Sequence, residues 1–354
     1  MRRMVDIASF MTGSVRCEQK DGWYSFYRFF GDQMISFENN IMFDMCAKMN
    51  AGLRMRLRTD ASRLEFTARS VAPKATLRSV AGLVSFYRGN DKKPKFKGGS
   101  REPYGACFDF YVDGKKMPSP FDTKGCVSFL LGERGTMRTV EIIFPYMLQL
   151  EIRDVLLYEC TAFEPVPDKK YALFLGDSVT QGADVIHPGN AWYRRVADAW
   201  EMDFLNQGVC GLVFTPATLS GLSLLERKPA RIVCAFGTND WGFSSATKKE
   251  QRLHDMRTYL SRLHTLFPET ETVIVTPFRR LDEYASGTFM SMRAWRQTIT
   301  EEAAQYANMR VIDGEALLPA DADYFYDTFL HPNDKGAAYL AEHFLAAYEK
   351  REEA

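Results

Sequence analysis

The chain has 354 residues, of which 46% are apolar, so it is long enough to fill two domains of ordinary size. Its formal net charge is zero, and its basic run, Lys92–Lys97, is interpreted as a solvated loop, so a nucleic-acid-binding protein is not expected. No run of about 18 apolar residues occurs, and Met1–Lys20 lacks the apolar core of a signal peptide. Seven cysteines without C-x-x-C pairs indicate neither a disulfide framework nor a zinc site, so a cytoplasmic location is the default expectation.

The first half of the chain predicts many short strands with glycine and proline between them. Leu53–Arg58 alternates apolar and basic residues, as a half-buried strand does, and Asp113-Gly114 is a hairpin turn signal. This texture is typical of an antiparallel sandwich or jelly roll, assigned to residues 1–162, and Thr161–Lys170 is read as a linker because of its two prolines. The other predicted strands lie near 33–37, 62–69, 80–87, 106–112, 126–131, 138–144 and 150–158.

The second half, residues 163–354, predicts an α/β domain with a doubly wound, five-stranded parallel sheet. Strand-like and helix-like segments alternate there, and such sheets bind ligands beyond the carboxyl ends of their strands. The strands are expected near 171–176, 203–206, 231–236, 271–276 and 309–312, and the helices near 190–201, 215–227, 247–267, 288–307 and 335–350.

Polar residues that could take part in catalysis follow three of these strands. Gly176-Asp177-Ser178 follows the apolar run Tyr171–Leu175, Asn206–Gly211 follows the short run Phe204-Leu205, and Gly237–Asp240 follows Arg231–Phe236. A fourth block, His331–Asp334, precedes the last predicted helix. Because the carboxyl ends of parallel strands meet at one edge of the sheet, these blocks are expected to converge there.

In this order and spacing, the four blocks over about residues 170–350 resemble the SGNH (GDSL-type) hydrolases, a family named for a Ser, a Gly, an Asn and a His. The resemblance implies a flavodoxin-like fold, with Ser178 as nucleophile and His331 as the base that takes its proton. It also implies an oxyanion hole made by the backbone N–H groups of Ser178 and Gly211 and the side-chain amide of Asn239. No metal or organic cofactor is expected.

The chain departs from the family pattern at the third member of the triad. The usual block has Asp three residues before His, whereas Asp327 lies four residues before His331, and position 328 is threonine. Asp327 reaches the second ring nitrogen if the loop is tighter or contains an extra turn; otherwise a backbone carbonyl orients the ring and the site works as a Ser–His dyad. Asp334 is expected to cap the last helix.

A β-sandwich followed by an SGNH domain is similar in arrangement to carbohydrate esterase family 2, whose members remove acetyl groups from plant polysaccharides or their oligosaccharides. Aromatic side chains often stack on sugars, but core packing is the more common role of any single one. Trp241, Asp177 and His187 are the weaker candidates for substrate binding, with Trp241 favoured among the aromatic residues because it follows Asn239 closely. The other aromatic candidates are Trp23, Tyr24, Tyr87 and Tyr104.

The predicted activity is that of a serine esterase acting on O-acetyl groups of plant-derived oligosaccharides such as xylo- or manno-oligosaccharides. Two alternatives use the same residues: hydrolysis of a short-chain lipid or lysophospholipid, and acyl transfer to an acceptor other than water. A third belongs to another class, a non-catalytic sugar-binding protein on a hydrolase scaffold. An acetylated carbohydrate is the expected partner, without nucleic acid or membrane, and a homo-oligomer is possible.

Overall fold

The structure, a computed structural model, describes residues 2–71, 107–119, 125–242, 245–283 and 289–350. The chain forms two compact units that interleave along the sequence. The first comprises Met1–Tyr27, Lys48–Pro167 and Ile186–Gly189, and the second comprises Arg28–Ala47, Asp168–Val185 and Asn190–Ala354. Residues 28–47, which precede the predicted boundary at 162, thus pack with the second unit. The predicted strand at 80–87, Tyr87, Tyr104 and the basic run at 92–97 lie outside the described residues.

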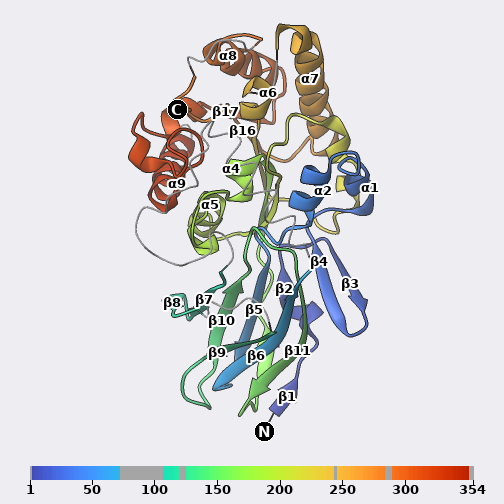
Figure 1. Ribbon diagram of the computed structural model, residues 1–354, viewed down its shortest axis with the longest axis vertical. Coiled ribbons are helices and arrows are strands. Elements are labelled where there is room, and N and C mark those ends of the chain that lie inside the picture. Colours follow the sequence, from blue (N-terminus) through green and yellow to red (C-terminus); the bar gives the residue numbers. More distant parts are fainter. Residues whose placement is uncertain (1, 72–106, 120–124, 243–244, 284–288, 351–354) are drawn as a thin grey trace, which may run out of the picture. The chain divides into compact units, whose positions relative to one another are not determined.

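The first unit contains two antiparallel sheets in its described residues (Figure 1). One has the order β3-β4-β11-β6-β9 with β1 paired to β11, and the other has the order β12-β5-β10-β7-β8 with β2 paired to β5. The strands are β1 (Arg2–Met4), β2 (Met11–Thr12), β3 (Arg16–Lys20), β4 (Trp23–Tyr27), β5 (Arg54–Thr59), β6 (Arg63–Ser70), β7 (Asp109–Val112), β8 (Lys115–Met117), β9 (Gly125–Leu130), β10 (Arg138–Ile143), β11 (Leu150–Tyr158) and β12 (Phe163–Pro165).

Aromatic rings join the inner faces of the two sheets. Phe129 of β9 lies 5.0 Å from Phe110 of β7 and 5.7 Å from Phe66 of β6, measured between ring centroids. Tilted ring pairs at such distances are favourable beyond the area they bury. The predicted hairpin turn is confirmed, because Asp113 and Gly114 both have positive φ values and join β7 to β8. The jelly-roll connectivity stays a prediction.

The predicted linker at 161–170 is wrong in its first half. Phe163–Pro165 forms β12, which pairs with β5 at the edge of the second sheet. An edge position tolerates Pro165 because one side of an edge strand needs no N–H donor. The described residues contain no helix that is long and apolar enough to cross a membrane.

The second unit contains a five-stranded parallel sheet in its described residues, with the order β14-β13-β15-β16-β17, which confirms the predicted fold class. Its strands are β13 (Tyr171–Gly176), β14 (Asp203–Gly208), β15 (Arg231–Ala235), β16 (Thr272–Val275) and β17 (Met309–Ile312). Gly176 pairs with both Gly208 and Ala235, so these three strands end at the same level. The segments that follow them therefore share one edge of the sheet.

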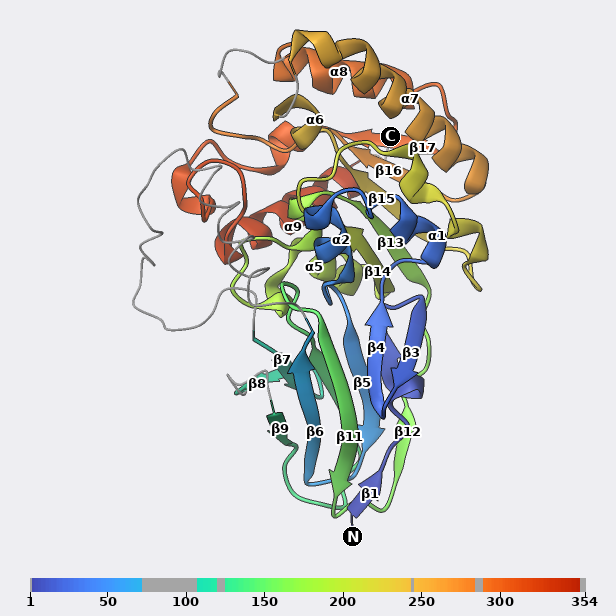
Figure 2. The same cartoon turned by 45° about the vertical axis from the view of Figure 1, so that its right-hand side comes forward.

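Helices of the second unit pack in pairs. Helix α5 (Trp192–Ala199) contacts α9 (Asp334–Glu349) through Trp192 and Phe344, and α7 (Lys249–Leu266) contacts α8 (Met292–Ala303). Figure 2 shows α7 and α8 lying together. Elsewhere in the described residues, the helices are α1 (Gly31–Ile35), α2 (Ile41–Lys48), α4 (Ser178–Gln181) and α6 (Thr238–Gly242). The 3-10 turns there are η1 (Ile7–Phe10), η2 (Pro188–Asn190), η3 (Pro216–Leu219), η4 (Leu222–Leu224), η5 (Ala246–Lys248), η6 (Gly314–Leu317) and η7 (Ala322–Tyr324).

Two predicted elements are wrong, each for a local reason. The strand expected at 33–37 is helix α1, in which the side chain of Gln33 accepts a hydrogen bond from the N–H of Phe30 and closes the first turn. The helix expected at 215–227 consists of the two 3-10 turns η3 and η4. Gly221, with φ of 79°, lies between them in the left-handed conformation, which ends a right-handed helix.

Residues 28–47 support the end of β14 within the second unit. The buried guanidinium of Arg28 donates to the carbonyls of Asn206 and Gly208, both at 2.9 Å, and to that of Cys46 at 2.7 Å. Buried carbonyl groups need such partners, since leaving them unpaired costs about 1–3 kcal/mol each. An N-terminal segment therefore fixes the strand that leads to Gly211.

Candidate active site

Ser178 is the first residue of α4, which begins two residues beyond the end of β13. The side chain of Asp177 caps this short helix by accepting a hydrogen bond from the N–H of Val179 at 3.0 Å, and Gly182, with φ of 94°, ends it. Burial raises the pKa of Asp177 to about 6. The cap explains why aspartate precedes the serine, and a contact of Asp177 with substrate stays a prediction.

Close packing of backbone fixes α4 against β14. A Cβ atom at Gly208 would lie 2.3 Å from the backbone nitrogen of Gln181, so only glycine fits there. The side chain of Asn206 donates to the carbonyl of Thr180 and accepts from the N–H of Gly208, both at 2.7 Å. The nucleophile segment and the segment that leads to Gly211 are therefore held as one body.

The hydroxyl of Ser178 and the ring of His331 are in direct contact. Oγ of Ser178 lies 2.8 Å from Nε2 of His331, which is hydrogen-bond distance for a base and its nucleophile. His331 lies in the loop between η7 and α9, where its carbonyl accepts a hydrogen bond from the N–H of Tyr326. Both side chains are largely buried.

Asp327 reaches the second ring nitrogen of His331 despite the four-residue spacing. Its Oδ2 accepts a hydrogen bond from Nδ1 of His331 at 2.8 Å, while its Oδ1 accepts from the N–H groups of Phe329, Leu330 and His331. Thr328 has φ of 73°, a left-handed conformation that lets the loop curl around the carboxylate. The extra residue thus makes a tight turn, and Ser178, His331 and Asp327 form a continuous hydrogen-bonded chain.

The negative charges of the neighbouring carboxylates favour the protonated form of the His331 ring. Burial alone would lower the pKa of His331, but attraction to the Asp327 and Asp184 carboxylates outweighs it and raises that pKa. Burial would raise the pKa of Asp327, yet the charge of His331 and the hydrogen bonds to the loop lower it. The pair is therefore suited to stabilise the imidazolium that forms when His331 accepts a proton.

The two other expected oxyanion groups lie just beyond the neighbouring strands. Gly211 has φ of 78° in the turn after β14, and a Cβ atom there would lie 2.6 Å from Cε of Met42. Asn239 lies in α6, after β15, and its Nδ2 donates to the carbonyl of Leu212 at 3.1 Å. An amide nitrogen has two hydrogens, so this bond fixes its plane while the second hydrogen is available for an oxyanion.

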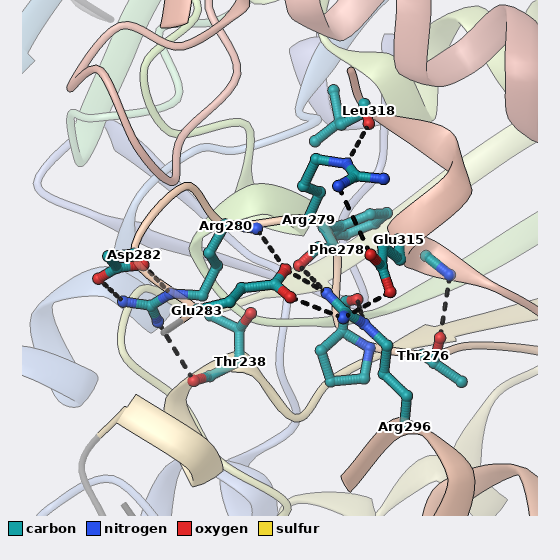
Figure 3. A network of polar contacts seen from close by, with 12 residues as sticks. Thr238, Thr276, Phe278, Arg279, Arg280, Asp282, Glu283, Arg296, Glu315 and Leu318 are labelled. Carbon is teal, nitrogen blue, oxygen red and sulfur yellow. Dashed lines mark hydrogen bonds and ion pairs between the residues drawn. The ribbon is translucent and has the colours of Figure 1, made fainter. Parts of the chain in front are cut away.

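An arginine network connects the segments that carry Asn239 and His331 (Figure 3). Arg280, in the loop after β16, forms two bonds with Asp282, each of 2.8 Å, and donates to the carbonyl of Thr238 at 3.4 Å. Its neighbour Leu281 donates its N–H to the carbonyl of Phe329. Arg280 is therefore occupied by intramolecular contacts.

Arg296 of α8 anchors the same loop. It donates to the carbonyls of Pro277 and Phe278 and pairs with Glu283 and Glu315 (Figure 3). A buried arginine with both carboxylate and carbonyl partners holds a loop in a single conformation.

The weaker substrate-binding candidates have structural roles in the described residues. Trp241 is 2% exposed and donates its indole N–H to the carbonyl of Met290, which places it in the core instead of on a sugar-binding surface. His187 lies in the first unit, where Nδ1 is 3.0 Å from the buried carboxylate of Asp109. The helix cap expected at Asp334 lies one residue earlier, at Asn333.

Asp184, Asp327 and His331 form a group whose ligand-type atoms lie within 4.8 Å of one another, a spacing that could hold a metal ion. A histidine that acts as a base through Nε2 carries its proton on Nδ1. The Nδ1 atom that faces both carboxylates is thus the one that donates to Asp327. The geometry therefore favours a proton over a metal ion between the ring and the two carboxylates.

Sequence reasoning missed Asp184 and Arg28. Asp184 lies only six residues after Ser178, so an acid within the nucleophile block was the available signal. Arg28 carries no signal, because an arginine far from every motif is ordinarily a surface residue.

The arrangement of Ser178, His331 and Asp327 at the edge of the parallel sheet matches the serine, histidine and carboxylate of serine hydrolases, which transfer acyl groups. Residues 174–339 match the model of the GDSL-like Lipase/Acylhydrolase family, so the chain contains a domain of that family, as the sequence blocks predict. This match supports the activity of an ester hydrolase.

Several solved structures have the same fold over nearly the whole chain. A salicylyl-acyltransferase from a tetracycline biosynthetic pathway matches with a TM-score of 0.77 at 19% identity, covering 99% of this chain and 98% of that one. A family two carbohydrate esterase from Cellvibrio japonicus matches with a TM-score of 0.64 at 14% identity and the same coverage. An acetyl xylan esterase from the rumen bacterium Butyrivibrio proteoclasticus matches with a TM-score of 0.59 at 12% identity, also with that coverage. No curated protein matches the sequence.

Proposed function

We propose that the protein is a serine esterase that removes O-acetyl groups from plant-derived oligosaccharides such as xylo- or manno-oligosaccharides. The observation that carries the esterase chemistry is the chain of two 2.8 Å contacts from Ser178 through His331 to Asp327. Support for a carbohydrate substrate comes from the two carbohydrate-active esterases that share the fold over 99% of this chain.

The proposed reaction has two halves that use the same groups. Oγ of Ser178 attacks the acetyl carbonyl carbon while its proton passes to Nε2 of His331, and the oxyanion accepts hydrogen bonds from the N–H groups of Ser178 and Gly211 and the amide of Asn239. The C–O bond to the sugar then breaks, and the sugar oxygen takes the proton from His331. Water then attacks the acetyl-serine while His331 takes its proton, the bond between the acyl carbon and Oγ breaks, and Oγ of Ser178 takes the proton back from His331 as acetate leaves.

The test is acetate release from acetylated xylo- and manno-oligosaccharides, measured beside hydrolysis of p-nitrophenyl acetate and octanoate. The Ser178→Ala variant serves as the blank, because activity that persists in it does not arise from this site. Release from the sugars that depends on Ser178 would support the proposal and identify the glycan. Activity on octanoate alone would replace it with a lipid esterase, and no hydrolysis of any ester would contradict the esterase proposal.

Acyl transfer is the second candidate, favoured by the fold shared with the salicylyl-acyltransferase. In that case the acyl-serine would react with an acceptor hydroxyl instead of water. Adding unacetylated oligosaccharides or small alcohols to the same assay would reveal it, because an acylated acceptor would accumulate at the expense of free acetate.

The activity is expected to decline on the acid side with a midpoint above the ordinary histidine value of 6.5. His331 acts as a base only when neutral, and its pKa is raised because Asp327 and Asp184 stabilise the charged ring. Below that pKa, kcat/KM should fall about tenfold per pH unit. A kcat/KM profile on p-nitrophenyl acetate measures the midpoint, and a value well below 6.5 would contradict the expectation.

A further inference from the structure

His331 faces two buried carboxylates, although a catalytic histidine needs only one. Its Nδ1 donates a hydrogen bond to Oδ2 of Asp327 at 2.8 Å and lies 3.2 Å from Oδ2 of Asp184. The side chains of Asp184 and Asp327 are 2% and 3% exposed, so water screens neither charge well. The contact with Asp184 is close enough for a strong charge interaction with a protonated ring.

The two carboxylates come from different segments of the chain. Asp327 belongs to the loop that carries His331, whereas Asp184 follows α4 in the turn that ends the nucleophile segment. The carbonyl of Ser178 accepts hydrogen bonds from the N–H groups of Gly182 and Ala183, which ties this turn to the nucleophile. Asp184 has φ of 75°, a conformation that aspartate tolerates better than most residues. Its carboxylate is therefore fixed relative to Ser178.

The arrangement favours the charged form of the ring specifically during the reaction. When the ring is neutral, Asp184 and Asp327 repel each other across it. When His331 takes the proton of Ser178, the imidazolium is attracted to both carboxylates. An interaction that strengthens as charge develops lowers the barrier to the chemical step. Asp177, the cap of α4, also interacts electrostatically with His331, and the positive charge of Arg280 interacts with Asp177 in the same way.

We propose that Asp184 is a second acid of this site, a positioning residue that holds the ring of His331 toward Ser178 and shares with Asp327 the stabilisation of its charge. This inference rests on the proposed role of His331 as base. Because Oδ1 of Asp327 is held by three backbone N–H groups, an amide at 327 would present its NH₂ group toward Nδ1. Asp184 would then be the carboxylate that keeps the proton on Nδ1.

Kinetics of single and double variants test the shared role. In serine hydrolases with a Ser-His-Asp triad, replacing the aspartate with asparagine lowers kcat by about 10⁴-fold because the histidine ring adopts the wrong tautomer. With Asp184 in place, Asp327→Asn should lower kcat by only about 10–100-fold, whereas the double variant Asp184→Asn with Asp327→Asn should lower kcat by roughly the full 10⁴-fold. A single Asp327→Asn variant as slow as the double variant would overturn the proposal.

The pH profile separates a charge effect from simple support of the fold. Asp184→Asn should move the acid limb of kcat/KM to lower pH by roughly one unit, since it removes one of two opposite charges next to the ring. Asp184→Gly, which suits the left-handed backbone, should move the limb equally and guards against misfolding of the first variant. Asp198→Asn, which removes a half-exposed carboxylate paired with Arg194, is the matched control and should leave the limb in place. An unmoved limb in both Asp184 variants would contradict the proposal.

A titration without substrate distinguishes failure of this inference from failure of the proposed function. The chain has five histidines, so the ring signals of His331 in NMR spectra can be assigned by their loss in His331→Ala. A lower pKa of His331 in Asp184→Asn would support the pairing even if no ester is hydrolysed. An unchanged titration would overturn it even if the enzyme is active.

Discussion

Replacing either Ser178 or His331 with alanine is expected to lower kcat on p-nitrophenyl acetate by about 10⁶-fold, and replacing both should lower it no further. The physical reason is that the two side chains act as one unit across a 2.8 Å contact. Without the base, the hydroxyl is a weak nucleophile, and without the nucleophile, the base has no proton to take. The residual rate comes from binding and the oxyanion hole.

The measurement is a double-mutant comparison of kcat and KM, with thermal unfolding as a check on the fold. Ser220→Ala and His254→Ala are matched controls, because both residues are exposed and lie in other segments of the second unit. Both controls should retain wild-type kcat. Losses that add in the double variant would mean that Ser178 and His331 act independently, which is incompatible with the proposed mechanism.

Replacing Asn239 with alanine is expected to lower kcat by about 10²–10³-fold with little change in KM. The amide is held by its bond to the carbonyl of Leu212, so its second N–H is oriented in advance for the charge that develops on the carbonyl oxygen. The hydrogen bond from a donor fixed in this way becomes strong only as the oxyanion forms. Its loss therefore lowers kcat more than it weakens substrate binding.

Asn239→Asp is the companion variant, because it keeps the size of the side chain but replaces its donor with a carboxylate. It should be at least as slow as Asn239→Ala at neutral pH, since a negative charge would face the oxyanion. Thermal unfolding of both variants shows whether the bond to Leu212 matters for stability. An alanine variant with normal kcat would remove Asn239 from the oxyanion hole.

Much of the site could be predicted because its residues follow strands whose ends the sequence marks. The run before Ser178 is apolar, and the run before Asn239 is apolar after Arg231, as in strands buried on both faces, so the sequence indicates where both strands end. Asp327 was predicted as the partner of Nδ1 only on condition that its loop is tight, with a Ser–His dyad as the alternative. The sequence could not decide between the two, because the position of Asp327 depends on the left-handed turn at Thr328 and on three backbone hydrogen bonds.

The predictions were wrong where contacts between residues distant in sequence outweigh the structural preference of the local sequence. The run at 33–37 has strand-like composition, yet Gln33 is buried and bonds to Gln207 and to the carbonyl of Thr218, and the segment folds as a helix there. Trp241 follows the Asn239 block closely, as a surface residue of a cleft could, but packing under Met290 and Arg280 buries it.

The amino-acid sequence by itself predicted the parallel sheet and the four blocks that follow its strands, because apolar runs and strand-end motifs are local properties of a chain. The resemblance of those blocks to a known family then pointed to Ser178, Gly211, Asn239 and His331 as the site residues. Only the tertiary structure decided that two carboxylates face His331 and that Arg28 supports the strand leading to Gly211. The contacts of Asp184 with His331 and of Arg28 with Gly208 join residues far apart in sequence, and their geometry is set by how the elements pack, which no local pattern records.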